Sequence, residues 1–177
     1  AIIRNNHIEN CERGIHVRDR PTVIGNTFEN CTVGIYSNAY KAGMNAIDNT
    51  LVNCGFHLSS SSYPFYENFH LEGNTVDGEE LLYILNGSGF DLNNEKARQI
   101  YLVNCDNFTV SDYHQAEQRN YPVMNVISCR DASISNSKFY AGSHYKGISD
   151  PDRFESSLRF EYSRNVVVRN NTIYDGD

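Results

Sequence analysis

The sequence predicts an all-β solenoid, in which short strands of successive rungs stack in parallel. The first observation is a repeated phrase that starts with Asn, has an apolar residue two positions later and then reaches Asn-Cys and Gly. The second is its spacing: Asn6, Asn26, Asn49 and Asn74 are separated by 20, 23 and 25 residues. The third is that helical periodicity is weak, while short alternating runs recur between polar turns.

The first half of the chain contains the clearest copies of the phrase. Each copy is expected to supply a short strand, a polar turn and a second strand. The segments are 6–11 with 14–17, 26–31 with 34–37, and 49–54 with 55–58. Asn at the first position is expected to tolerate a left-handed backbone and to hydrogen-bond through its amide with the same amide of the next rung.

The second half repeats a related pattern with longer apolar strands. Segments 74–76 and 82–84 come first, and 170–173 closes the series. Between them, 100–105 leads into 106–110, 124–129 into 130–134, and 158–163 into 164–168. Strands of this length fit about seven rungs, each advancing about 4.8 Å. We therefore predict one β-helix domain over residues 1–177.

Composition excludes several classes of function. The formal net charge is −7 and no Lys/Arg run stands out, which argues against a nucleic-acid partner. No apolar stretch approaches the roughly 20 residues of a membrane helix, so membrane insertion is not expected. The chain has no initiator Met and starts and ends within the repeat, so a fragment of a longer protein is expected.

The five cysteines favour a packing role. Cys11, Cys31 and Cys54 share one repeat position, while Cys105 and Cys129 share another. No Cys-x-x-Cys spacing occurs, and an odd number cannot pair completely. Buried thiols that act as small apolar residues are therefore favoured over a disulfide or metal role, and no metal-ligand set is predicted.

Three segments carry a resemblance to a known family: Gly25-Asn26-Thr27-Phe28, Gly73-Asn74-Thr75-Val76 and Asn170-Asn171-Thr172-Ile173. They resemble the repeats of right-handed parallel β-helices of the pectate-lyase-like superfamily and its NosD-type relatives. The resemblance implies a right-handed, single-stranded parallel β-helix. The acidic, Tyr-rich and Asn-rich composition is similar to that of secreted or cell-surface carbohydrate-active members, among them disaggregatase-related proteins. An extracellular or cell-surface location is the corresponding expectation.

The catalytic patterns of that superfamily are missing. The Asn-Thr-Asp, Asp-Asp, Gly-His-Gly and Arg-Ile-Lys patterns of polygalacturonase-like members do not occur. Asp150-Pro151-Asp152 stands where the alginate-epimerase-like members would have Asp-Pro-His. The resemblance therefore implies a fold and transfers no catalytic residue.

One row of side chains is predicted to face outward along the stacked strands. If Ile15 and Val17 point into the solenoid, the residue between them points out, and the same holds for later strands. The row consists of His16, Tyr36, His57, Tyr83, Tyr101, Asn125 and Arg159. Its aromatic rings could stack on sugar rings, which predicts a substrate-binding platform. Two alternatives are aromatic residues that merely favour strands and a homo-oligomer contact, for example a trimer.

A polar cluster near the C-terminus supplies the candidate catalytic residues. It contains His144, Lys146, Asp150, Asp152, Glu155, Arg159 and Glu161. Glycoside hydrolysis needs two carboxyl groups, and the cluster offers several. A lyase needs a base and neutralisation of a uronate, often by Ca²⁺, for which no motif is present. A solvated charged loop is the simpler alternative.

The sequence therefore favours an extracellular protein that acts on a polysaccharide, as a hydrolase or a lyase, without a required cofactor. The alternative is a non-catalytic carbohydrate-binding or structural module that forms oligomers.

Overall fold

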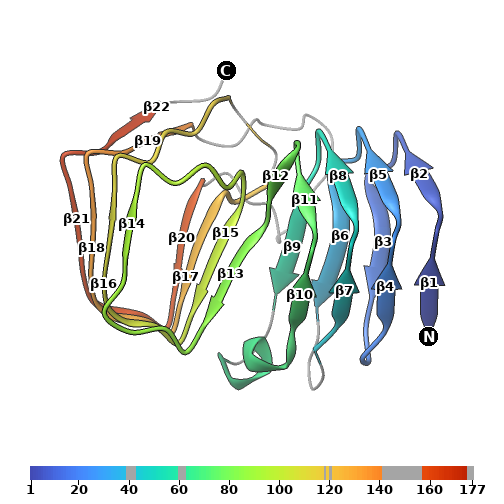
Figure 1. Cartoon of the computed structure of the whole chain (residues 1–177), viewed down its shortest axis with the longest axis horizontal. Coiled ribbons are helices and arrows are strands. Elements are labelled where there is room, and N and C mark those ends of the chain that lie inside the picture. Colours follow the sequence, from blue (N-terminus) through green and yellow to red (C-terminus); the bar gives the residue numbers. More distant parts are fainter. Residues whose placement is uncertain (39–42, 60–62, 118, 120, 141–156, 175–177) are drawn as a thin grey trace. The chain divides into compact units, whose positions relative to one another are not determined.

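The computed structural model describes residues 1–38, 43–59, 63–117, 119, 121–140 and 157–174. It is built almost entirely of short strands (Figure 1). The chain divides into two compact units. Unit 1 comprises Ala1–Tyr83 with Ala97–Gln99, and unit 2 comprises Ile84–Lys96 with Ile100–Asp177.

In unit 1 the parallel pairs join strands that lie three places apart in the chain. The first sheet has the order β1 (Ile2–Arg4), β4 (Thr22–Ile24), β7 (Asn45–Ile47), β10 (His70–Glu72). The second has β2 (His7–Glu9), β5 (Thr27–Glu29), β8 (Thr50–Val52), β11 (Thr75–Val76), and the third β3 (Arg13–Val17), β6 (Val33–Asn38), β9 (Phe56–Ser59). These pairs are parallel, whereas β12 (Glu79–Glu80) pairs antiparallel with β11. A 3₁₀ helix, η1, covers Tyr63–Asn68.

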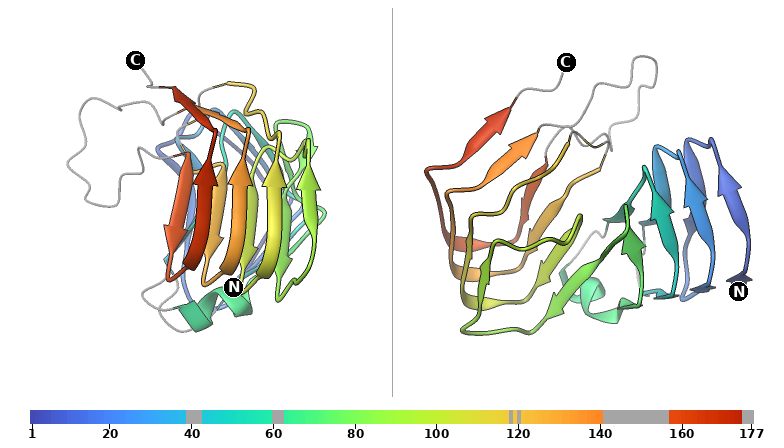
Figure 2. Two further views of the ribbon diagram at one scale, coloured as in Figure 1. Left: turned by 90° about the vertical axis from the view of Figure 1, so that its left-hand side faces the viewer. Right: turned by 45° about the horizontal axis from the view of Figure 1, so that its top comes forward.

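Unit 2 repeats the stacking with longer strands. One sheet has the order β13 (Leu82–Leu85), β15 (Ile100–Val103), β17 (Met124–Ile127), β20 (Leu158–Glu161), with β13 beginning in the last residues of unit 1. Another has β14 (Asp91–Asn93), β16 (Asp106–Ser111), β18 (Arg130–Ser135), β21 (Arg164–Arg169), and β19 (Lys138–Tyr140) pairs with β22 (Thr172–Tyr174). The arrows of β16, β18 and β21 run in the same direction in Figure 2.

The predicted all-β, parallel β-helix fold is thus confirmed. The total of about seven rungs and the single domain stay predictions, because the strands divide between two units. Among the described residues, no helix has the length and apolar character needed to cross a membrane.

The core of each unit is a stack of apolar side chains from successive rungs. In unit 1, Phe28 lies in register with Leu51, and Leu51 with Val76, and all three are fully buried. In unit 2, the ring of Phe90 stacks on that of Phe108 with 5.1 Å between centroids and 2° between planes. Each rung therefore buries its inward residues on its neighbours, which a lone rung could not do.

A ladder of asparagines supports one corner of unit 1. Asn26, Asn49 and Asn74 are buried, and the Asn49 amide nitrogen donates to Asn74 Oδ1 at 2.9 Å. The amide nitrogen of Asn26 donates to Asn49 Oδ1 at 3.0 Å. This confirms the predicted hydrogen bonding from rung to rung.

The left-handed backbone lies at other positions than predicted. The ladder residues Asn26 and Asn49 have no positive φ; positive φ occurs one residue earlier, as at Gly25 (62°) and Asp48 (52°). A second set lies at the end of the phrase, at Asn10, Asn30 and Asn53. Asn therefore has two separate roles: closing a tight corner and hydrogen-bonding along the stack.

The cysteines agree with the predicted packing role. All five are free thiols, of which Cys31, Cys54, Cys105 and Cys129 are buried and Cys11 is partly exposed. Burial raises the pKa of the Cys54 thiol to about 12. The pKa of Cys129 is raised as well, because its thiol hydrogen-bonds to Cys105 and is buried.

We expect Ellman's reagent to modify Cys11 of the folded chain quickly at pH 8, and Cys54 at least about 1,000-fold more slowly. Only the thiolate reacts, and a thiol with a pKa near 12 is almost entirely protonated at that pH. Stopped-flow absorbance measures the phases, and Cys11→Ser should remove the fast one. A fast phase equal to five thiols in the folded protein would contradict the burial of Cys31, Cys54, Cys105 and Cys129.

Candidate functional site

The predicted outward row is a true register row within unit 1. His16 on β3 is the partner of Tyr36 on β6, and Tyr36 is the partner of His57 on β9. Neighbouring rings make edge-to-face contacts, with centroids 4.8 Å apart for His16 and Tyr36 and 4.9 Å apart for Tyr36 and His57. The sequence therefore predicted which side chains stand above one another.

The predicted solvent exposure of this row is wrong for two of its three members. Tyr36 and His57 are 2% and 4% exposed, whereas His16 on the outer strand is exposed. Rungs stand so close that each ring covers the next, and the Arg13 guanidinium carbon lies 4.4 Å from the centre of the Tyr36 ring. Alternation along a strand indicates the face of a residue but not what lies over that face.

A polar fringe borders the exposed end of the row. His16 Nε2 lies 2.8 Å from Asn38 Oδ1, and Arg18 Nε donates to the same oxygen at 3.2 Å. An imidazole, an amide and a guanidinium thus meet beside an aromatic ring. Groups of these types bind sugar hydroxyls and carboxylates.

Tyr83, the next predicted member, is half-buried and already engaged. Its hydroxyl donates to the backbone oxygen of Tyr66 in η1 at 2.5 Å. Tyr66 itself is fully buried, and its hydroxyl donates to the Leu58 carbonyl at 3.4 Å. This part of the row anchors η1 within unit 1.

In unit 2 the predicted row comprises Tyr101, Asn125 and Arg159. Tyr101 on β15 is the partner of Asn125 on β17, which is the partner of Arg159 on β20. Tyr101 and Asn125 are fully buried and Arg159 is 8% exposed, so exposure was again wrongly predicted. In unit 2 this part of the row is therefore buried and does not form a surface platform.

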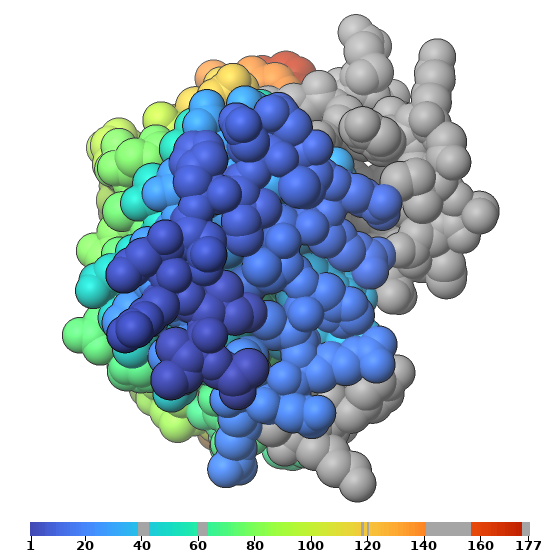
Figure 3. Space-filling view, turned by 90° about the vertical axis from the view of Figure 1, so that its right-hand side faces the viewer, coloured from blue at the N-terminus to red at the C-terminus, as the bar shows by residue number. Residues whose placement is uncertain are grey.

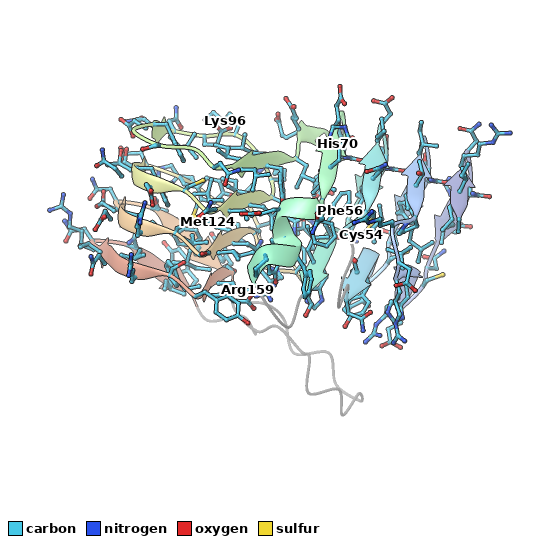
Figure 4. All side chains as sticks on the ribbon, turned by 90° about the horizontal axis from the view of Figure 1, so that it is seen from below. Cys54, Phe56, His70, Lys96, Met124 and Arg159 are labelled. Carbon is cyan, nitrogen blue, oxygen red and sulfur yellow. The ribbon has the colours of Figure 1, made fainter. Side chains whose placement is uncertain are left out.

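Two of the predicted catalytic residues meet on β20. Arg159 (Figure 4) donates from its Nη2 to the Glu161 carboxylate, and the two side chains lie two residues apart on the same face of the strand. The Arg159 side chain is 8% exposed and that of Glu161 25%. A nearly buried guanidinium is thus held next to a carboxylate that solvent still reaches.

Asn125, the register partner of Arg159, has a buried side-chain oxygen without a hydrogen bond in the described structure. Its amide nitrogen donates to the carbonyls of Ile100 and Pro122, both at 3.3 Å. Within the described part of the chain, its buried Oδ1 accepts no hydrogen bond, and the buried hydroxyl of Ser157 has no partner either. An unsatisfied buried acceptor costs about 1–3 kcal/mol, so such atoms require an explanation.

The remaining predicted catalytic residues, His144, Lys146, Asp150, Asp152 and Glu155, lie outside the described residues. Their catalytic roles stay predictions, as does the pair of carboxylates that hydrolysis requires.

The structure also brings together residues that sequence reasoning missed. His7 and Glu9 on β2 and Glu29 on β5 offer one nitrogen and two carboxylate oxygens that lie within 4.8 Å of one another. These residues are exposed or half-buried. The signal was present in the repeat, because aligning Asn6 with Asn26 also aligns Glu9 with Glu29.

Comparison with known proteins identifies the repeat. A family described as "Right handed beta helix region" matches residues 1–106, which is more than half of the 177 residues. No curated protein and no solved structure matches the chain.

Proposed function

Since the chain belongs to the right-handed β-helix family, we propose that it is an extracellular protein that binds and cleaves a polysaccharide. The observation that carries the proposal is a set of three polar residues in unit 2, which we call the polar line: Asn125, Arg159 and Glu161. Asn125 and Arg159 are register partners, and Arg159 donates to Glu161. The asparagine ladder of unit 1 serves stacking, and its side-chain amides hydrogen-bond to one another. The line in unit 2 differs, because the buried Asn125 Oδ1 accepts no hydrogen bond within the described residues. Buried polar groups with an uncompensated acceptor are more typical of sites that bind or react.

The residues of the line have distinct chemical capacities. Arg159 carries a fixed fork of N–H donors, which binds a carboxylate or a hydroxyl oxygen of a sugar. Glu161 can transfer a proton to or from the glycan, and Asn125 Oδ1 can accept a hydrogen bond from a sugar hydroxyl. These roles suit either hydrolysis, with a second carboxylate, or β-elimination from a uronate.

The row in unit 1 would contribute binding. His16, Arg18 and Asn38 would hold hydroxyl or carboxylate groups at the exposed end of the ring stack. Tyr36 and His57 would act indirectly, because their burial leaves them to position His16 rather than to touch a sugar.

The experiment is incubation of the chain with a panel of neutral and acidic polysaccharides. We expect new reducing ends from at least one member of the panel. Ultraviolet absorbance of unsaturated uronates separates elimination, where it rises, from hydrolysis, where it does not. A panel without product and without measurable binding by affinity electrophoresis would contradict the proposal.

A second candidate is a non-catalytic structural module that forms oligomers. The burial of Tyr36, His57, Tyr101 and Asn125 favours it, since buried rows can serve stacking alone. Exposed apolar side chains on β21 and β22, such as Val167, Ile173 and Tyr174, also suit a contact with another chain. Light scattering that reports an oligomer, together with no cleavage of any glycan, would favour this candidate.

A further inference from the structure

The first two rungs place a mixed set of metal-binding side chains on the outside of unit 1. β2 and β5 are parallel, with His7 opposite Thr27 and Glu9 opposite Glu29. His7 and Glu9 lie two residues apart and therefore on the same face of β2. His7 Nε2 lies 3.8 Å from Glu9 Oε2 and 3.9 Å from Glu29 Oε2. β2 is the end strand of its sheet, and the blue residues of this end face the viewer in Figure 3.

We propose that His7, Glu9 and Glu29 bind a divalent transition-metal ion, with Zn²⁺ as the best match. One imidazole nitrogen and two carboxylate oxygens are donors that Zn²⁺ accepts. Three protein ligands leave a fourth position for water or another oxygen ligand. Ligand atoms around one tetrahedral Zn²⁺ stand about 3.4 Å apart, so the observed separations need only small side-chain rotations.

The register supplies a physical reason for a cation at this place. Glu9 and Glu29 are direct cross-strand partners, and like charges in that arrangement repel each other. A divalent ion between them removes the repulsion and ties the end strand β2 to β5. Protonated His7 could also bridge the two carboxylates, and direct metal binding distinguishes the two explanations.

The chain contains a matched control for this site. His70 and Glu72 on β10 repeat the His-x-Glu pattern, and His70 Nε2 lies 3.1 Å from Glu72 Oε2. Their partners on β7 are Asn45 and Ile47, so no carboxylate from the next rung completes the set. Both residues are exposed, and Figure 4 labels His70 on β10. Among the residues that the structure describes, this position thus offers two potential ligands instead of three.

The test is calorimetric titration of the chelator-treated chain with Zn²⁺. We expect one saturable site, and Glu29→Gln or His7→Ala should weaken its affinity at least about 30-fold. His70→Ala and Glu72→Gln should leave the affinity unchanged. Titration with Co²⁺ adds a spectroscopic readout, because a spectrum without a thiolate charge-transfer band excludes the cysteines as ligands.

Hydrogen exchange gives a readout independent of binding heat. The Asn10 amide donates to the Glu29 carbonyl, and the Thr27 amide donates to the Asn6 carbonyl. Zn²⁺ should slow exchange at both amides in the wild type and not in Glu29→Gln. No saturable binding by the wild type, or equal binding by wild type and Glu29→Gln, would overturn the proposal. Equal loss in His70→Ala would overturn it as well.

Discussion

Replacing Asn49 with alanine is expected to lower the free energy of unfolding by about 3 kcal/mol, roughly a 150-fold change in the folding equilibrium. Asn49 is fully buried, and its Oδ1 accepts from both the backbone N–H and the side-chain amide of Asn26, each at 3.0 Å. Its own amide nitrogen donates to the Val23 carbonyl at 2.9 Å. Alanine removes the hydrogen-bond partners of these buried groups, and each group left unpaired loses free energy on burial.

Urea unfolding followed by circular dichroism measures this effect, and Asn6→Ala is the matched control. Asn6 is the exposed end of the same ladder and donates to Asn26 Oδ1 at 2.9 Å. Water can take its place, so a loss below about 1 kcal/mol is expected. Equal destabilisation by both variants would show that burial does not set the strength of the ladder.

Much of the fold could be predicted because the repeat encodes strand register. The intervals between Asn6, Asn26 and Asn49 align Phe28 with Leu51 and His16 with Tyr36, as found. The 21-residue interval between Gly34 and Gly55 aligns Tyr36 with His57, also as found. Side-chain alternation then sorts each strand into an inward and an outward set. The left-handed residues escaped this reasoning, because Asn serves at two corners and the sequence pattern does not separate the two roles.

The site was less predictable because exposure depends on what lies over a face. Asn125 and Tyr101 alternate outward along their strands and are nevertheless fully buried. Arg159 and Glu161 could be paired from their spacing of two residues, whereas the His7 and Glu29 contact depends on comparing adjacent rungs. The strand register between distant segments could thus be predicted from the sequence. Which outward side chains are buried by other parts of the chain could not.

Replacing Glu161 with glutamine is expected to reduce the turnover number on a cleaved polysaccharide by about 1,000-fold, if Glu161 transfers the proton. The amide keeps the shape of the side chain and an oxygen that can accept from Arg159. It cannot take up or release a proton in the reaction. Initial rates of product release at saturating glycan measure the change, and circular dichroism verifies that the variant is folded.

The matched control is Glu72→Gln, which also changes a glutamate two residues after a basic residue on an end strand of its sheet. Glu72 lies on β10 in unit 1, so its replacement should leave turnover unchanged. Arg159→Lys keeps the charge but loses the fork of donors, and it should raise KM more than it lowers kcat if Arg159 binds the sugar. Wild-type turnover in a folded Glu161→Gln variant would remove Glu161 from the chemistry. The binding line would then consist of Asn125 and Arg159, with the proton moved by another group.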